Sequence, residues 1–248
     1  MKNIAFPVLL WLALPAFCWG QFSRQGTITF ARKYSMKRAI QLSENNDWAK
    51  QFIDQMPESV TTEFTLAFND RQSCYTFQKE EDLKGFASYM VSSSVAYKNQ
   101  VWDDFTRHMS VAQKQFYEKT YLIADSMPRF QWKIEDEIRT IAGYSCRKAV
   151  TRICDSVVVV AFYTNQIMVT GGPESFNGLP GMILGIAIPR LYTTWFATKV
   201  ELDPPSGEAL AAPSKGSRVT RETFYSDITK AIKDWSKSGA KAIWEITL

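Results

Sequence analysis

The 248-residue chain has little of several features that mark common functional classes. Its one histidine, His108, excludes a metal site built on two or more histidines of this chain. It has no block of lysine and arginine, and its formal net charge of +4 is too small to indicate a nucleic-acid-binding protein. No nucleotide-binding glycine pattern occurs either. What is present, 46% hydrophobic residues including many aromatics, is typical of a globular protein with a substantial core.

Long hydrophobic runs are also missing. A helix that crosses a bilayer needs about 20 apolar residues, and the apolar run at 4–17 is shorter than that. This run follows Lys2 and precedes Gly20, which is the pattern of a secretory signal peptide. We therefore expect a leader at 1–20 that is cleaved after Gly20, followed by a single domain at 21–248. The mature protein is predicted to be periplasmic or secreted, without a transmembrane segment.

Cysteine is scarce. Cys18 raises the alternative of a lipoprotein, but Phe17 stands where a lipoprotein leader carries a small residue, so we favour export without a lipid. Cys74, Cys146 and Cys154 remain in the mature chain and are disulfide candidates, because export leads to an oxidising compartment. The sequence leaves open which two would pair. The alternative is that the cysteines stay reduced and buried.

Alternation of apolar and polar residues dominates the mature chain and predicts strand after strand. The segments expected as strands are 27–32, 63–68, a strand through Tyr75 and Phe77 that follows a turn at 69–72, 100–106, 111–117, 119–124, a segment that starts at 132, 143–151, 157–164, 181–188, 193–202 and 242–247. Helical spacing predicts a helix at 43–56, capped by Ser43, and a C-terminal helix near 220–238, capped by Thr220. The predicted fold class is α+β, with a large curved antiparallel sheet, half-barrel-like, and one or two packed helices.

Four motifs in the second half of the chain carry a family resemblance. They are Trp132-Lys133-Ile134, the run from Ile141 to Ala149, Ala161-Phe162-Tyr163-Thr164, and the run from Gly172 to Leu184 that contains Gly178-Leu179-Pro180-Gly181-Met182-Ile183. In order and spacing they resemble the GLPGLI family of exported Bacteroidetes proteins. The chain departs from the family pattern at Phe162, where the family has Trp, and at Met182, where it has Leu. Both departures keep a large apolar side chain, so the implied fold is unaffected.

The resemblance implies a location more than an activity. Members of the family look periplasmic or secreted, and their genes often lie near TonB-dependent outer-membrane transporters. The family has no established reaction to carry over. An envelope transporter is therefore one expected partner, and a small apolar ligand is the other.

A binding site in the concave face of the sheet is the first functional hypothesis. Its candidate residues are Tyr144, Phe162, Tyr163 and Trp195 as aromatic lining, with Phe176, Gly178, Leu179, Pro180, Gly181 and Met182 at the rim. The alternative is that the aromatics are ordinary core and that the glycines and prolines form a rigid corner that delivers the chain into the next strand. Successive glycine amides could also form an anion-binding nest.

Signals for catalysis are weak. Asp104, Thr106 and His108 would point the same way on a strand, and the run from Glu135 to Glu137 offers paired carboxylates. No nucleophile motif accompanies them, and a surface histidine and a solvated acidic edge are the alternatives. We therefore expect a non-enzymatic ligand- or partner-binding protein with no cofactor and no metal. The competing hypotheses are a hydrolase that uses His108 with nearby carboxylates, and a metal-handling protein.

Overall fold

The computed structural model describes residues 23–42, 47–85, 87–88, 98–154, 156–233 and 239–247. The predicted leader at 1–20 and the predicted cap Ser43 lie outside these residues. The strands are β1 (Gly26–Tyr34), β2 (Val60–Phe68), β3 (Gln72–Glu80), β4 (Gln100–Asp104), β5 (Met109–Phe116), β6 (Lys119–Ser126), β7 (Lys133–Ile141), β8 (Tyr144–Ile153), β9 (Val157–Thr164), β10 (Met182–Ile188), β11 (Thr193–Glu201) and β12 (Ser217–Val219).

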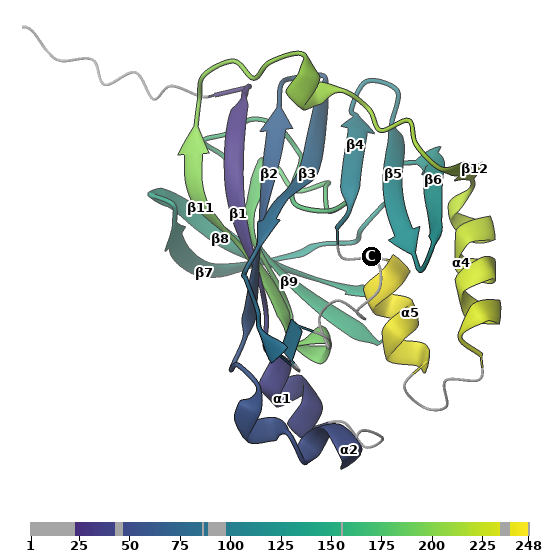
Figure 1. The fold of residues 1–248 in the computed structure, drawn as a ribbon. Coiled ribbons are helices and arrows are strands. Elements are labelled where there is room, and N and C mark those ends of the chain that lie inside the picture. The colour runs from purple at the N-terminus through teal and green to yellow at the C-terminus, as the bar shows by residue number, and fades with distance from the viewer. Residues whose placement is uncertain are drawn as a thin grey trace, which may run out of the picture.

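These strands form one 12-stranded sheet in the order β12-β6-β5-β4-β3-β2-β1-β11-β10-β9-β8-β7. Neighbouring strands are antiparallel except for β12, which runs parallel to β6. Figure 1 shows that the sheet curls, so that β7 to β9 pass behind the strands from β1 to β6. The prediction of a large curved antiparallel sheet with few helices is confirmed.

The core lies against one face of this sheet, which we call the inner face. It is built by alternate residues of each strand, such as Ile28 and Phe30 in β1 and Phe64 and Leu66 in β2, all of them buried. Tyr75 of β3 stacks on Phe64, with ring centroids 4.7 Å apart. Burial of such side chains is the main stabilising contribution to the sheet, since each removes a large apolar area from water.

The helices differ from expectation in two places. Within the predicted helix at 43–56 the described residues form two short pieces, α2 (Asp47–Lys50) and the 3-10 turn η1 (Ile53–Gln55), and a further short helix, α1 (Met36–Gln41), precedes that range. The segment expected as a final strand is the helix α5 (Gly239–Thr247). Gly239, the residue just after the predicted helix near 220–238, therefore begins a helix.

Helix α4 (Arg221–Ala231), which corresponds to the helix predicted at 220–238, is shorter than predicted, and 234–238 lie outside the described residues. Its predicted cap is confirmed, because the hydroxyl of Thr220 accepts a hydrogen bond from the backbone N–H of Thr223 at 3.2 Å. Phe224 packs edge-on against Tyr121 of β6, with ring centroids 5.0 Å apart. Helices α4 and α5 contact each other and lie together beside β5 and β6 (Figure 1).

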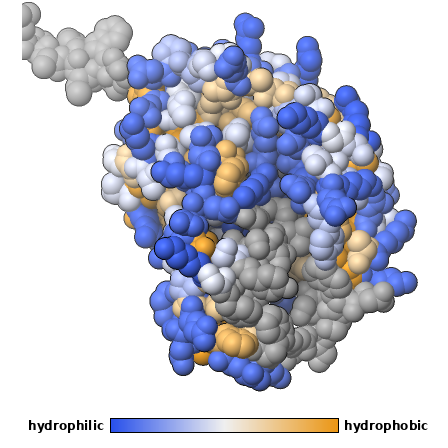
Figure 2. Space-filling view, in the orientation of Figure 1, coloured by the Kyte–Doolittle hydropathy of each residue, from blue (hydrophilic) through white to orange (hydrophobic). Residues whose placement is uncertain are grey.

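Loops and short turns complete the chain. The 3-10 turns η2 (Pro189–Leu191) and η3 (Glu208–Leu210) flank β11. Segment 207–211 covers the outer face of β3, where the carbonyl oxygen of Ala211 lies 3.5 Å from the sulfur of Cys74. The molecular face in Figure 2 is largely hydrophilic, and its apolar residues form separate small groups.

Candidate functional site

The predicted catalytic group around His108 does not form. Residues 105–108 make the turn between β4 and β5, so Asp104, Thr106 and His108 do not share one strand face. Oδ1 of Asp104 accepts hydrogen bonds from the backbone N–H groups of Thr106 at 2.9 Å and Arg107 at 3.0 Å, as well as from the Thr106 hydroxyl at 2.6 Å. That carboxylate therefore holds the turn together.

The acidic run in β7 lies on an edge strand of the sheet. The register of β7 against β8 shifts between Ile134 and Ile138, so the acidic residues occupy a bulge. There Asp136 pairs with Arg147 at 2.6 Å, and Glu137 pairs with Lys148 at 2.7 Å. The run is thus a set of exposed ion pairs, and the bulge with its charges blunts the edge against pairing with another strand.

The predicted binding residues are spread over several places. Met182 and Leu179 are core, Phe162 stacks beneath the guanidinium of Arg139 on the other face, and Trp195 is buried below Arg32. Tyr144 packs against the core from a half-buried position. Gly181 has φ 141° and is held against the backbone of Thr164, which leaves no room for a Cβ.

Three cavities take up the remaining predicted residues. Phe176 lines one of about 170 Å³, Gly178 lines a second of about 510 Å³, and Tyr163 with Pro180 lines a third of about 260 Å³. The loop from Gly172 to Gly181 thus lines all three cavities as well as forming a corner. It contributes different residues to each cavity.

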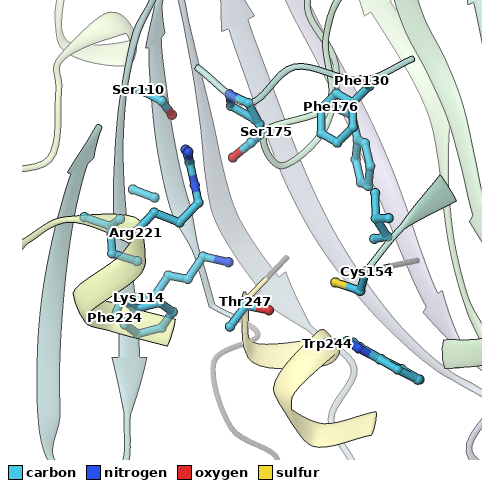
Figure 3. Close-up of a pocket in the computed structure, with 14 residues that line it drawn as sticks. Ser110, Lys114, Phe130, Cys154, Ser175, Phe176, Arg221, Phe224, Trp244 and Thr247 are labelled. Carbon is cyan, nitrogen blue, oxygen red and sulfur yellow. The ribbon is translucent and has the colours of Figure 1, made fainter. Parts of the chain in front are cut away.

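The first cavity lies on the inner face, between β5 and β6 on one side and the end of β8 with the β8–β9 turn on the other. Figure 3 shows the cationic side chains Lys114 and Arg221 on one side, together with Phe224, and Phe130, Phe176 and Trp244 on the other. Its lining consists of Ser110, Ala112, Lys114, Ile123, Pro128, Phe130, Ile153, Cys154, Ser175, Phe176, Arg221, Phe224, Trp244 and Thr247.

Buried charged groups surround this cavity, and the sequence pattern does not single out most of them. Lys114 is 3% exposed at an inward position of β5, and its Nζ donates to the carbonyl oxygen of Ile246 at 3.3 Å. Burial lowers the pKa of Lys114 to about 8, an effect that the charge of Arg221 adds to and that of Glu174 opposes.

A row of polar side chains crosses the inner face next to the cavity. Asp103 of β4 is directly opposite Ser110 of β5, which is directly opposite Asp125 of β6. Burial raises the pKa of Asp103 to about 6, although the Ser110 hydroxyl bonds to it. Asp125 accepts a hydrogen bond from the backbone N–H of Arg221 at 3.1 Å, which fixes the start of α4 at the end of this row.

Glu174 connects the loop to β4. Its carboxylate is buried and accepts a hydrogen bond from Nδ2 of Asn99 at 3.0 Å. Its backbone is left-handed, with φ 55°, which is uncommon for a side chain of this size. Nearby, the indole N–H of Trp132 donates to the Asn177 carbonyl at 2.8 Å, so the loop is pinned on two sides.

Other chemistries find less support in the described residues. No group of three or more His, Cys, Asp or Glu side chains that could hold a metal ion occurs among them. No disulfide joins the three described cysteines. Cys74 and Cys146 are buried, Cys154 is exposed in the β8–β9 turn, and burial raises the pKa of Cys146 to about 11. Cys146 and Cys154 lie toward opposite ends of the extended strand β8, too far apart to bond.

The helices of the described part of the chain are short. None of them combines the length and the hydropathy needed to span a bilayer.

Comparison with known proteins locates the family signal in the second half of the chain. A family described as "Protein of unknown function (Porph_ging)" matches residues 151–185. This stretch contains β9 and the whole loop that leads into β10, and the match is compatible with the resemblance to GLPGLI proteins. No curated protein matches the chain.

Two solved structures of one protein share the fold at low identity. Two structures of PNGF-II, in the C2 and P21 space groups, have a TM-score of 0.51 with 14% and 15% identity. They cover 90% and 84% of this chain, which spans only 33% and 34% of theirs. An uncharacterized conserved protein from Thermus thermophilus has a TM-score of 0.40 at 10% identity, covering 81% of this chain and 92% of its own. At such identities the PNGF-II likeness shows the fold alone.

Proposed function

We propose that the protein is a non-enzymatic binding protein that holds a small, largely apolar ligand in the cavity on the inner face of its sheet. The observation that carries this proposal is the cavity of about 170 Å³, which has the cationic Lys114 and Arg221 on one side and three aromatic side chains on the other. An engineered cavity of about 150 Å³ in another protein takes up benzene, so the volume suits a compact ligand. Concave, mostly apolar sites with a few polar groups are typical of ligand binding.

We further propose that the protein is exported and acts in the cell envelope, in support of a TonB-dependent transport system. The leader pattern at 1–20 and the resemblance of residues 132–184 to exported GLPGLI proteins support this part. The cavity is the structural feature that agrees with a role in transport. A protein that holds a small molecule would suit a system that moves small molecules.

Native mass spectrometry of the protein purified from its own host tests the binding proposal. We expect the wild-type chain to carry an additional small mass that is lost on denaturation. Ala112→Phe places a ring into the cavity and should abolish that mass. Ala124→Phe is the matched control, because Ala124 is half-buried on the opposite face of neighbouring strand β6 and does not line the cavity.

The two outcomes are distinct. A bound mass in the wild type and in Ala124→Phe, but not in Ala112→Phe, supports the proposal. A bare wild-type protein, or a mass that survives in Ala112→Phe, contradicts it. The competing hydrolase hypothesis keeps its own test, since it requires that His108→Ala destroys any activity that is found.

A further inference from the structure

The charged residues that line the cavity all carry positive charge. Among the described residues that line it, two are cationic, Lys114 and Arg221, and none is acidic. We propose that the ligand is a small monocarboxylate whose carboxylate pairs with Lys114 and whose apolar tail lies among the aromatic side chains. This inference rests on the proposed function and names the class of its ligand.

Lys114 provides the strongest argument for an anion. Its side chain is buried, and its ammonium group has a neutral backbone carbonyl, that of Ile246, at the long distance of 3.3 Å. A buried ammonium group is costly unless an anion or several strong acceptors compensate for it. A carboxylate that enters the cavity would supply short, charge-assisted hydrogen bonds to Nζ.

The carboxylates close to the cavity are already engaged elsewhere. Asp125 accepts the backbone N–H of Arg221, and Glu174 accepts the side-chain amide of Asn99. Asp103 is paired with Ser110 across β4 and β5, one strand away from Lys114, and burial disfavours its ionised form. These groups soften the positive charge of the lining, and none of them lines the cavity itself.

Arg221 and three hydroxyl groups complete the polar side. Arg221 donates through Nη2 to the backbone oxygen of Ser126 at 3.1 Å, and this holds it at the boundary of the adjoining cavity of about 510 Å³, which it also lines. Ser110, Ser175 and Thr247 add hydroxyl groups beside it in the lining (Figure 3). Since Arg221 is already held by the backbone oxygen of Ser126, the buried Lys114 with the three hydroxyl groups suits a single negative charge.

The opposite side of the cavity suits a short hydrocarbon tail. Phe130 and Phe176 lie with their ring centroids 5.2 Å apart, and Trp244 lies below them across the cavity from Lys114 (Figure 3). The volume of about 170 Å³ limits the tail to a few carbons, because a benzene-sized molecule fills a cavity of about 150 Å³.

A set of three probes on the wild-type protein tests the charge of the ligand. Isothermal titration at pH 7 with pentanoate, pentan-1-ol and pentylammonium keeps the tail constant and changes only the head group. We expect pentanoate to bind at least ~10-fold more tightly than pentan-1-ol, as a charge-assisted hydrogen bond to a buried partner implies. Pentylammonium should show no binding.

A pair of variants locates the effect. Lys114→Met keeps the length of the side chain and removes its charge, so it should abolish the preference for pentanoate over pentan-1-ol while pentan-1-ol still binds. Lys79→Met is the matched control, because its side chain is 72% exposed on β3 and the variant loses the same charge. A cooperative thermal unfolding transition shows that each variant is folded. If Lys114→Met does not fold, the wild-type comparison of the probes decides alone.

The outcomes separate this inference from the proposed function. Equal affinity for pentanoate and pentan-1-ol, or an unchanged preference in folded Lys114→Met, overturns the carboxylate assignment and leaves an apolar ligand site. No binding of any probe, together with a bare protein from the native host, overturns both.

Discussion

Replacement of Lys114 by Met should stabilise the unliganded protein, which is an unusual expectation for the loss of a charged side chain. Burial depresses the pKa of Lys114 from its ordinary 10.5 to about 8. A depression of this size means that the folded state holds the proton less tightly than the unfolded chain, by about 3 kcal/mol. This loss of folding stability applies in full below pH 8, where Lys114 is protonated in both the folded and the unfolded state.

The variant also loses favourable interactions. The hydrogen bond from Nζ to the carbonyl oxygen of Ile246 is worth about 1 kcal/mol. Subtracting it leaves Lys114→Met about 2 kcal/mol more stable than the wild type at pH 7. Such a gain is in line with other cases in which an apolar side chain of similar shape replaces a buried charge.

The pH dependence is the sharper part of this prediction. Between pH 8 and 10.5 the unfolded chain binds more protons at Lys114 than the folded protein, so the stability of the wild type rises relative to the variant. The ionisation cost falls from about 3 kcal/mol at pH 7 to about 1 kcal/mol at pH 10. Comparison with the variant cancels the titration of all other groups that the substitution leaves unchanged.

Urea unfolding of both proteins at pH 7, 8, 9 and 10, without ligand, measures these differences. We expect the stability advantage of Lys114→Met to shrink by about 2 kcal/mol across the range. A difference that stays constant with pH would refute the reasoning. So would a variant that is less stable at every pH, because Lys114 would then be a net stabilising residue.

Three further predictions concern other parts of the molecule. Asp103→Asn should be more stable than the wild type above pH 6 by up to about 3 kcal/mol and equal to it below pH 4, because burial raises the pKa of Asp103 from 3.8 to about 6. Urea unfolding above pH 6 and below pH 4 measures the difference, and a stability advantage at low pH only would contradict the prediction. Gly181→Ala should lower the melting temperature by many degrees, since its Cβ would meet the carbonyl oxygen of Thr164 at φ 141°, whereas Gly207→Ala, with open space around it, should melt like the wild type. Iodoacetamide at pH 8 should label the folded mature protein, residues 21–248, once, at Cys154, because its other two cysteines, Cys74 and Cys146, are buried; two rapid labels, or one that survives Cys154→Ser, would contradict this.

The fold was largely predictable because the strands carry a clear pattern. In β1, β2 and β9, apolar residues recur at every second position or fill the strand, and turns separate them, so the antiparallel sheet follows from local signals. The strand expected at 242–247 was wrong for a physical reason. Trp244 and Ile246 fit the strand period, Ile243 and Ile246 fit the helical period, and so short a run does not distinguish the two.

The cavity was harder to predict, as Lys114 shows. Strand β5 has one set of alternate residues that reads Ser, Ala, Lys, Phe and another that reads Met, Val, Gln, Gln. The two sets are about equally polar, so the sequence does not say which set faces the core. The inward position of Lys114 is decided by the pairing of β5 with β4 and β6.

The other charged groups near the cavity come from distant parts of the chain. Asp103, Glu174 and Arg221 lie in a strand, a loop and a helix start, and the curl of the sheet and the packing of α4 bring them together. Nothing local to Glu174 distinguishes it from a solvated loop residue. The sequence did mark the loop itself, whose Phe176 and Gly178 line two of the cavities.

A methyl NMR titration of the wild-type protein with pentanoate tests most directly whether the inner-face cavity binds an anionic, apolar-tailed ligand. We expect saturable shifts at Ala112, Ile123 and Ile153, which line the cavity, and no shift at Ile134 and Ile138, which are exposed on the edge strand β7. Shifts confined to the edge strand, or no saturable shift at the three cavity methyl groups, would contradict the binding site.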